Sequence, residues 1–502
     1  MRQKLISLFS APKLAWIIIG FGILVRLIQY LYNRSLWADE AVLALNIVNR
    51  SYLELLQPLD YDQAAPIGFL VIEKFAVQLF GNNEYALRLF PLVSGIGSLL
   101  LFYVLAKQCL DKTAIPVALI LFASLNQLVY YASEVKQYST DVAVALLSCL
   151  VAMQVGNPKL SQVQTFIIAI VGAIAIWFSH PAIFVLFGVG FTSLAINIVS
   201  NKTLKITNIL VIYPAWLFSF ALFYFGSLRE IGSNNDLLKS WGEAFPSSPL
   251  DIIWLLDAFG KFFYKPLGFS GFFDGIAIFA FVLGCISYFY RRKATLAILL
   301  SPLFATFAAA YLQKYPFRGR LVLFLTPFFI ILIAEGVSYI FRKKNYKFTI
   351  IAGSVILILL LVPPIASASS LIINPNLKEE IKPVISYVKT HQQSGDVIYI
   401  FQRGRYQFEY YAKKYGYQEG DYIIGVEDLD NYDGKQVSQE EWRRYKSDLD
   451  KLRGNQRVWL IFSHAHLRQE NEMINAYLEK IGKRIDSFQA TGAFVYLYDL
   501  SQ

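Results

Sequence analysis

Long apolar runs separated by short polar stretches fill the chain from Leu14 to Ile365. Most of the runs are long enough to cross a hydrocarbon core about 30 Å thick as an α-helix. The pattern predicts about eleven membrane-spanning helices. They are expected at Leu14–Tyr32, Ala86–Lys107, Thr113–Tyr130, Ser139–Val155, Gln164–Phe178, Ala182–Ser200, Ile206–Phe225, Gly271–Tyr290, Ala294–Leu312, Leu321–Phe341 and Phe348–Ile365.

One apolar run, Ile67–Phe80, is not expected to cross the membrane. It is short, and Glu73 and Lys74 interrupt it. Counting it as a span would invert every later loop and place most cations on the wrong side of the membrane. We therefore predict that Glu40–Phe80 forms interfacial helices on the outer surface, within an interfacial loop over residues 34–85. Tyr52–Leu56 has the spacing of an amphipathic helix.

Lysines and arginines set the orientation, because loops rich in these residues stay in the cytoplasm. With a cytoplasmic N-terminus, the cytoplasmic loops carry Lys107, Lys112, Lys159, Lys202, Lys205, Arg291, Arg292, Lys293, Arg342, Lys343, Lys344 and Lys347. The short turns on the opposite side are nearly free of cations. An odd number of spans then places the C-terminal region outside the cytoplasm.

Composition agrees with a multispanning membrane protein: 56% of the 502 residues are hydrophobic, 16% are charged, and the mean hydropathy is +0.45. The net charge of +10 follows the loops, and no nucleic-acid partner is predicted. Cys109, Cys149 and Cys285 lie in or beside apolar segments, so no disulfide framework is expected. No small-residue cleavage site follows the first apolar run, which favours an uncleaved first span.

From about Asn374 the composition becomes that of a soluble domain. Strands are expected at Asp396–Phe401, Asp421–Val426, Arg457–Phe462, Arg484–Phe488 and Ala493–Tyr498, and helices at Tyr406–Tyr415, Glu440–Leu452 and Gln469–Ile481. This alternation predicts a small α/β domain. The predicted fold is thus an α-helical polytopic membrane protein, with a transmembrane catalytic domain over residues 1–370 and an extracytoplasmic α/β domain over 371–502.

Two adjacent carboxylates, Asp39 and Glu40, follow the first predicted span directly after Trp37. Carboxylates at the outer membrane surface can act on water-borne hydroxyl groups, so this pair is the first candidate for catalysis. The other interpretation is structural, because Asp is a favourable N-cap residue for the helix that follows.

Further charged groups fall on the same predicted outer face. Glu134 and Lys136 lie among tyrosines that include Tyr138, and the loop Gln313–Arg320 carries Arg318 and Arg320 on the side that is usually poor in cations. An anionic ligand such as a phosphate would explain these cations. Alternatively, they belong to an interfacial tyrosine belt and to cations that snorkel to outer headgroups.

Four residues complete the set of candidates. Arg26 lies inside the first span and needs a partner or a polar cavity, which Asp39 or Glu84 would supply. Arg88 follows Glu84 by four residues, as in a local helical ion pair. His180 lies in a short predicted outer turn. A histidine without other candidate ligands nearby more often has a structural role than a ligand role. No spacing typical of a metal site is present, and no cofactor is predicted.

Carboxylates near water and cations near the membrane boundary suit a lipid-linked phosphate donor. A carboxylate would accept the proton of an acceptor hydroxyl that attacks the anomeric carbon of a sugar. Cations would stabilise the departing polyprenyl phosphate, which leaves as an anion.

These residues resemble the GT-C superfamily of integral membrane glycosyltransferases, in the branch of protein O-mannosyltransferases and bacterial aminoarabinose and lipopolysaccharide-core transferases. The resemblance covers Leu14 to about Ile365. It rests on Arg26 before the Trp-x-Asp-Glu-Ala run Trp37–Ala41, the Pro-led segment Ala65–Ile67, the helix opening Glu84–Pro91, the turn Ser133–Tyr138 with Lys136 in place of Arg, and Arg320 seven residues before Pro327, with Leu321 in place of Tyr.

The resemblance implies that Asp39 is the catalytic carboxylate and that the donor is a polyprenyl-phosphate monosaccharide. Acceptors in the family are lipids, glycans or proteins, and an outer soluble domain often engages them. Some relatives bind a divalent cation near the acidic motif and others need none, so this point stays open. The expected location is the bacterial inner membrane, among its lipids, with the C-terminal domain in the periplasm.

Two other function classes stay open from the residues. A polytopic transporter or flippase of a lipid-linked sugar or anionic lipid would show paired broken helices and internal repeats, and no repeat is evident. A polysaccharide polymerase or ligase also uses lipid-linked sugars but needs an oligosaccharide donor. The acidic pair directly after the first span favours the monosaccharide transferase.

Overall fold

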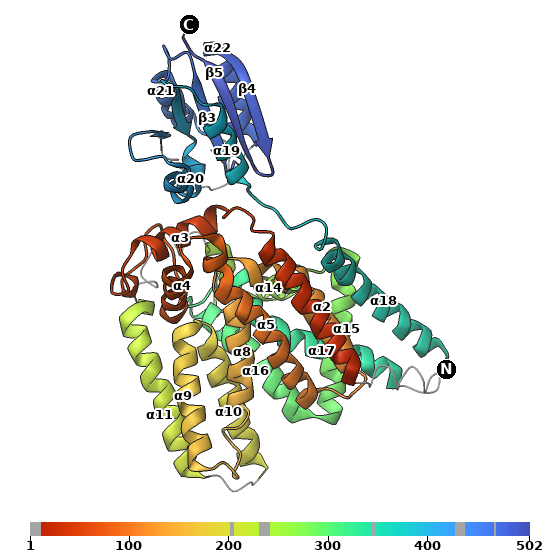
Figure 1. Ribbon diagram of the computed structural model, residues 1–502. Coiled ribbons are helices and arrows are strands. Elements are labelled where there is room, and N and C mark those ends of the chain that lie inside the picture. The colour runs from red at the N-terminus through yellow and green to blue at the C-terminus, as the bar shows by residue number, and fades with distance from the viewer. Residues whose placement is uncertain are drawn as a thin grey trace. The chain divides into compact units, whose positions relative to one another are not determined.

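The computed structural model describes residues 12–200, 205–229, 241–342, 347–426, 437–465 and 468–501 (Figure 1). Contacts divide the chain into two compact units. The helical unit contains residues 1–32 and 50–375, and the C-terminal unit contains residues 33–49 and 376–502. We predicted a domain boundary at residue 370, and the contacts divide the chain after Pro375. Residues 33–49 group with the C-terminal unit, although we predicted an interfacial loop over residues 34–85.

Most helices of the helical unit fall where the apolar runs predict them. They are α2 (Pro12–Leu31), α4 (Ile67–Phe80), α5 (Glu84–Cys109), α6 (Ile115–Ser124), α7 (Asn126–Tyr130), α8 (Tyr138–Ala152), α9 (Gln162–Phe178), α10 (Ala182–Val199), α11 (Ile206–Phe223), α14 (Ile252–Tyr264), α15 (Phe272–Arg291), α16 (Lys293–Tyr311), α17 (Thr326–Arg342) and α18 (Lys347–Ser370). Short helical turns, all but one of the 3-10 type, are η1 (Glu54–Leu56), η2 (Tyr131–Ser133), the π-turn η3 (Tyr224–Leu228), η4 (Gly242–Ala244) and η5 (Gly319–Leu325).

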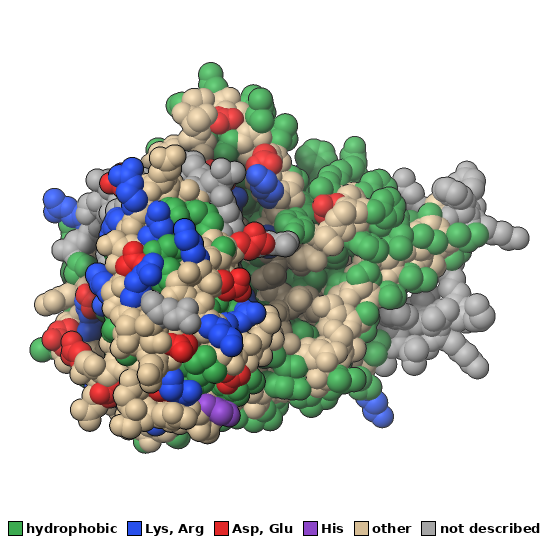
Figure 2. Space-filling view, turned by 90° about the horizontal axis from the view of Figure 1, so that it is seen from above, with side chains coloured by type: hydrophobic (Ala, Val, Ile, Leu, Met, Phe, Trp, Pro, Cys, Tyr) green, Lys and Arg blue, Asp and Glu red, His purple; other side chains and the backbone are tan. Residues whose placement is uncertain are grey.

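Within the described residues, eight helices are long and apolar enough to cross a membrane. The pair α6 and α7, bent by 58° at a short break, supplies a ninth, and α8 and α9 are shorter apolar helices. Each of the eleven predicted spans coincides with one of these, so the polytopic helical fold is confirmed. In Figure 2 hydrophobic side chains cover a broad part of the face in view, as helices against lipid require, while charged side chains gather on another part.

One of the two helices outside the predicted spans was expected and the other was not. α14 lies in what we expected to be a long loop, and Asp251 caps it by accepting a hydrogen bond from the Trp254 backbone N–H at 2.9 Å. α4 forms as a 14-residue helix that is not among the candidate spans. Its Glu73 is fully buried, and this burial raises the pKa of the carboxyl well above its usual value.

Close backbone contact between α15 and α17 organises the centre of the helical unit. A Cβ atom added to Gly336 would lie 1.8 Å from the Ala280 carbonyl oxygen, and one added to Gly284 would lie 1.9 Å from that of Leu332. Only glycine permits this approach, which is the small-residue packing typical of membrane helices. α17 is accordingly the most buried of the candidate spans.

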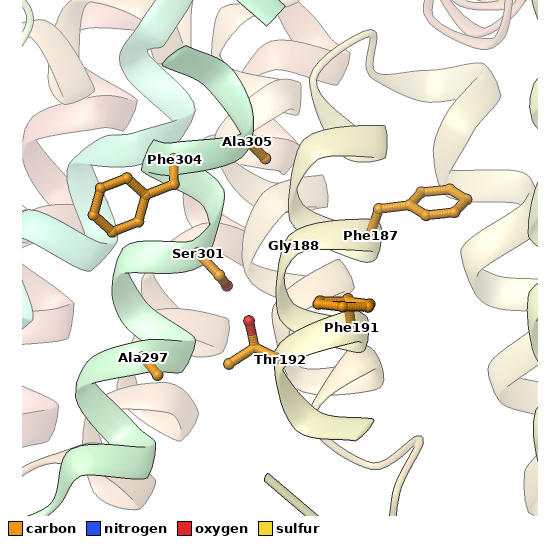
Figure 3. A pocket seen from close by; sticks show the side chains of 8 residues that line it. All are labelled: Phe187, Gly188, Phe191, Thr192, Ala297, Ser301, Phe304 and Ala305. Atoms are coloured by element: carbon orange, nitrogen blue, oxygen red, sulfur yellow. The ribbon is translucent and has the colours of Figure 1, made fainter. Parts of the chain in front are cut away.

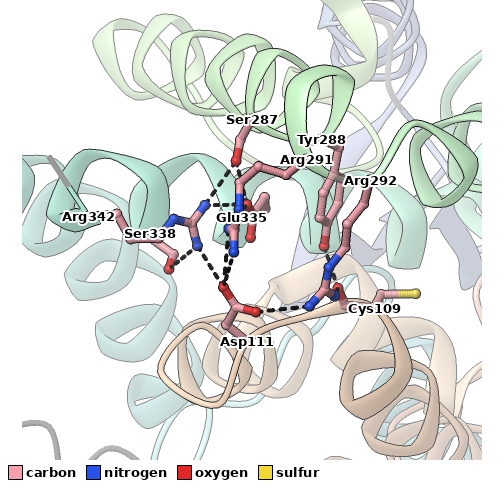
Figure 4. Close-up of polar contacts among 9 residues, drawn as sticks. All are labelled: Cys109, Asp111, Ser287, Tyr288, Arg291, Arg292, Glu335, Ser338 and Arg342. Atoms are coloured by element: carbon pink, nitrogen blue, oxygen red, sulfur yellow. Dashed lines mark hydrogen bonds and ion pairs between the residues drawn. The ribbon is translucent and has the colours of Figure 1, made fainter.

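An ion-pair network ties three helix ends together on the side that the charge rule assigns to the cytoplasm (Figure 4). Asp111, which follows α5, accepts from Arg342 at 3.0 Å, Arg292 at 3.1 Å and Arg291 at 3.2 Å. Arg342 also pairs with the buried Glu335. Because Arg291 and Arg342 lie in the last turns of α15 and α17, they also oppose the negative ends of those helices.

We expect Asp111→Ala to destabilise the protein by about 1–2 kcal/mol, because three arginines lose a shared acceptor in a half-buried site. The measurement is thermal unfolding of the purified protein in detergent. Asp257→Ala is the matched control, since Asp257 pairs with Lys261 only on an exposed helix surface. Equal changes in melting temperature for the two variants would contradict a structural role for the network.

The C-terminal unit is built on a five-stranded mixed sheet. The strands are β1 (Val397–Ile400), β2 (Ile423–Ile424), β3 (Val458–Ser463), β4 (Lys483–Ala490) and β5 (Ala493–Asp499), in the order β2-β1-β3-β5-β4. β1 pairs in parallel with β2 and β3, and β5 pairs antiparallel with β3 and β4. All six residues of the central strand β3 are buried, as the apolar run predicts.

Helices pack around this sheet, and they are α19 (Ile381–His391), α20 (Arg405–Ala412), α21 (Gln439–Asp450) and α22 (Arg468–Ile481), with the short turns η6 (Gln402–Gly404) and η7 (Lys413–Tyr415). The five strands and three of these helices lie where the sequence predicts them, so the α/β prediction is confirmed. α19 was not predicted. The unit also contains α3 (Ala38–Asn49), which comes from the far N-terminal part of the chain.

Candidate active site

The two acidic residues after the first span lie in the first turn of α3. The helix begins at Ala38, so Asp39 and Glu40 occupy its second and third positions and neither is the N-cap. Glu40 is fully buried, and its Oε2 accepts a hydrogen bond from the Trp37 backbone N–H at 3.4 Å. Glu40 therefore helps to cap the helix, as in the reciprocal half of a capping box. Asp39 is partly exposed, next to the positive end of the helix dipole.

The residues that lead into α3 are held by the C-terminal unit. The Leu36 backbone N–H donates to the Tyr411 hydroxyl at 2.9 Å, and the Ala38 N–H donates to Glu379 Oε2 at 2.9 Å. The Lys378 ammonium lies 3.6 Å from the centre of the Trp37 ring. The Trp37–Ala41 run is thus fixed at its start by side chains more than 300 positions away in sequence, a link that no local pattern indicates.

In the helical unit, the turn between α7 and α8 is buried. Glu134 is fully buried and Lys136 is 5% exposed, and the Lys136 ammonium donates to Gln63 Oε1 at 2.6 Å. Tyr130, Tyr131 and Tyr138 are also buried. Charges solvated in an interfacial tyrosine belt would be exposed, so this alternative is wrong for the turn. Burying such charged groups without specific partners would be costly.

Arg318 and Arg320 differ in their surroundings. The Arg320 guanidinium lies 5.4 Å from the centre of the Tyr138 ring and 6.0 Å from that of Trp241. Arg318 pairs with the exposed Glu243 at 2.5 Å, and this contact lowers the pKa of the Glu243 carboxyl. The fold thus brings Arg320 to Tyr138 at the start of α8, two residues after Lys136, while Arg318 serves a surface ion pair.

Arg26 has a structural environment. Its guanidinium is fully buried and donates to the carbonyl oxygens of Gly22, Ala123 and Phe122 at 3.0, 3.1 and 3.3 Å. The last two lie at the end of α6, where the bend into α7 interrupts the helical hydrogen bonds. The prediction that Asp39 or Glu84 is the partner of Arg26 is wrong. Backbone carbonyl groups freed by the break in the helix accept its hydrogen bonds instead.

Glu84 and Arg88 lie in the first turns of α5 and are both buried, at 6% and 2% exposure. Asn83 caps this helix by accepting from the Ala86 N–H at 2.9 Å. Their four-residue spacing fits the local pair that the sequence predicts.

His180 stands in the turn between α9 and α10. Its Nε2 atom is buried, its ring lies 5.6 Å from that of Phe223, and burial lowers its pKa to about 4. The imidazole is therefore neutral near pH 7 and provides no positive charge for a phosphate.

Sequence analysis missed Asp141 and Tyr315. Asp141 is 4% exposed in the first turn of α8, one helical turn after Tyr138. The pKa of Tyr315 is raised well above its usual value, first because the tyrosine is buried and second because of the Asp141 carboxylate. The Tyr315 hydroxyl donates to the Leu321 carbonyl at 2.7 Å, beside Arg320. A carboxylate inside an apolar run was the signal for Asp141.

No group of three His, Cys, Asp or Glu side chains that would hold a metal ion occurs among the described residues. A groove of about 600 Å³ lies between α10 and α16, where Ser301 and Thr192 point toward each other among apolar side chains (Figure 3). Its lining contains no charged side chain, so it offers neither a carboxylate for proton transfer nor a cation for a phosphate.

Comparison with known proteins rests on structure. No protein-family model and no curated protein matches the chain. ArnT from Cupriavidus metallidurans, an aminoarabinose transferase, is 11% identical with a TM-score of 0.52 in its apo state, covering 97% of this chain and 98% of that one. Its structure bound to undecaprenyl phosphate gives a TM-score of 0.53 at 11% identity, covering 96% and 98%.

The archaeal oligosaccharyltransferase AglB from Archaeoglobus fulgidus is also similar. In complex with an inhibitory peptide and a dolichol-phosphate, it is 11% identical with a TM-score of 0.52, covering 96% of this chain and 74% of that one. Both proteins are GT-C membrane glycosyltransferases. The chain has the GT-C fold. The resemblance drawn from the residues around Trp37–Ala41 is thereby confirmed at the level of fold, and the GT-C architecture extends over nearly the whole chain.

A pH-dependent stability follows from His180. The unfolded imidazole takes up a proton below its ordinary pKa of 6.5, but the folded one resists protonation down to about 4. Stability contributed by His180 is therefore complete above pH 6.5 and is lost as the pH falls toward 4. We expect the melting temperature of His180→Gln to fall less than that of wild type between pH 7 and pH 4.5. Identical pH profiles would show that His180 is not held neutral.

Proposed function

We propose that this protein is a membrane glycosyltransferase that moves a monosaccharide from a polyprenyl-phosphate donor to a hydroxyl of a lipid, glycan or protein acceptor. The observation that carries the proposal is the acidic first turn of α3 in a chain that shares the GT-C fold over nearly its whole length with ArnT and AglB. The ArnT and AglB structures with undecaprenyl phosphate and dolichol-phosphate support a lipid-phosphate donor.

Asp39 is the proposed catalytic base. The acceptor oxygen forms a bond to the anomeric carbon, and its proton passes to the Asp39 carboxylate. The bond between the anomeric carbon and the phosphate oxygen breaks, and its electron pair leaves with the polyprenyl phosphate. Asp39 suits this role better than Glu40, because Glu40 is fully buried and already accepts the Trp37 N–H.

Lys136 and Arg320 are the proposed donor-phosphate residues. Charge on the departing phosphate grows in the transition state, so cations fixed in advance lower the barrier. Lys136 is fixed by Gln63, and Arg320 lies over the Tyr138 ring. The Tyr138 ring faces the Arg320 guanidinium, and Glu134 is buried two residues before Lys136. Arg318 pairs with Glu243, Arg26 donates to backbone carbonyls and His180 is neutral, so these three residues are not assigned to the donor phosphate.

The proposed location is the bacterial inner membrane, with the active site and the C-terminal unit on the periplasmic side. The cluster of Arg291, Arg292 and Arg342 at one end of the helical unit supports this orientation, because loops rich in arginine stay in the cytoplasm. Mass spectrometry of lipids that co-purify with the protein would name the donor head group.

Asp39→Asn should abolish sugar transfer, because the amide cannot accept the proton but keeps the size of the side chain. The assay uses purified protein in nanodiscs and the undecaprenyl-phosphate monosaccharide, from a synthetic panel, that wild type consumes, with release of undecaprenyl phosphate as the readout. Asp60→Asn is the matched control, since Asp60 forms an exposed ion pair with Arg50 in the helical unit. Turnover by Asp39→Asn at the wild-type rate, with normal folding, would refute the proposal.

Arg320→Ala should raise the KM for the lipid-phosphate donor by about tenfold or more, because a charge-assisted contact to phosphate contributes roughly 1.5–3 kcal/mol. Arg318→Ala should have a smaller effect, since Arg318 already pairs with Glu243. Steady-state kinetics with varied donor distinguish the two. An unchanged KM in Arg320→Ala would leave Arg320 as an anchor at the membrane interface.

A further inference from the structure

The acidic helix α3 belongs to the C-terminal unit, although it follows the first membrane span in sequence. This unit provides the partners for the backbone just before the helix. The Ser35 N–H and hydroxyl donate to Glu380 at 3.1 and 3.0 Å, and the Lys382 ammonium donates to the Asn33 carbonyl at 2.6 Å. The path of the chain into α3 is therefore fixed by side chains and not only by the helix itself.

Glu379 is the centre of this arrangement. Its side chain is buried at 3% exposure, and its Oε2 accepts both the Ala38 N–H and the Gln407 amide, each at 2.9 Å. Its Oε1 lies 2.7 Å from His464 Nδ1. Gln407 in turn donates to the Leu36 carbonyl at 3.1 Å. A carboxylate at this position satisfies a helix N–H that has no intrahelical partner and lies at the positive end of the dipole.

The backbone around Glu379 is itself held firmly. The Glu380 N–H donates to the Thr491 carbonyl at 2.7 Å, in the turn between β4 and β5. Gly492 in that turn has a φ of +66°, and a Cβ atom there would lie 2.0 Å from the Lys378 carbonyl oxygen. The sheet hairpin thus supports Glu379, and Glu379 supports the first residue of α3.

We propose that Glu379 is a positioning residue for Asp39, so that the C-terminal unit is part of the catalytic apparatus and not only a domain for acceptor binding. This inference rests on the proposed function. Glu379 contacts the residue before Asp39 through its backbone, and it acts through that contact without touching substrate. Fixing the first turn of α3 fixes the direction in which the Asp39 carboxylate points.

Glu379→Ala should lower kcat by about tenfold to a hundredfold, because a shift of about 1 Å in a reacting group costs up to about that factor. The donor KM should change by less than about threefold, since that residue is not proposed to bind donor. Glu379→Gln should keep most of kcat, because its amide oxygen still accepts the Ala38 N–H while His464 adopts the tautomer that accepts from the new amide. The assay is undecaprenyl phosphate release from full-length protein in nanodiscs.

Hydrogen exchange of the peptide that contains residues 33–49 gives a readout that is independent of activity. Exchange there should be faster in Glu379→Ala than in wild type and nearly unchanged in Glu379→Gln. Glu409→Ala is the matched control, because Glu409 is a carboxylate of the same unit that pairs with Arg405 within α20. It should behave as wild type in both measurements.

Tyr411→Phe keeps the inference testable if Glu379→Ala does not fold. It preserves the buried ring and removes the hydroxyl that accepts the Leu36 N–H, so it should also lower kcat more than KM. Wild-type kcat in both Glu379→Ala and Tyr411→Phe would overturn the inference, as would a loss in Glu379→Gln equal to that in Glu379→Ala. Turnover by Asp39→Asn would instead remove the proposed function and leave the hydrogen-exchange result standing.

Discussion

Burying a charged side chain costs several kcal/mol unless hydrogen bonds or opposite charges replace the water that it loses, and this chain buries charge at each place where its fold is unusual. Arg26 is fully buried where the bend between α6 and α7 leaves carbonyl groups to be satisfied. Glu335 is buried in α17, where it pairs with Arg342 of the same helix and with Arg291 in the last turn of α15. Glu379 is buried where α3 begins. Arg26 and Glu379 satisfy backbone groups that lack a helical partner, whereas Glu335 is held by the side chains of Arg291, Arg342 and Ser287.

The same constraint explains why a fold can persist at 11% identity. In hydrocarbon every backbone group must be satisfied within the helix or by a neighbour, which fixes where helices run and where they are allowed to break. It does not fix which apolar residues fill the spans. Positions such as Gly284 and Gly336 are the exceptions, because the contact between the α15 and α17 backbones leaves no room for a side chain.

The assignment of α3 to the C-terminal unit changes how the chemistry is organised along the chain. The proposed base Asp39 belongs to one compact unit, whereas the proposed phosphate residues Lys136 and Arg320 belong to the other.

The sequence by itself determined the positions of the apolar helices, the five strands of the C-terminal unit and the acidic run at Asp39, because hydrophobic periodicity and charge bias are local signals. It did not reveal α14, α19, the backbone partners of Arg26 or the environment of His180. Only the tertiary structure decided that Arg318 faces Glu243 while Arg320 faces Tyr138, and that Glu379 holds the start of α3. These contacts join residues far apart in the chain, and burial and hydrogen-bond geometry select them only after the helices and strands have packed.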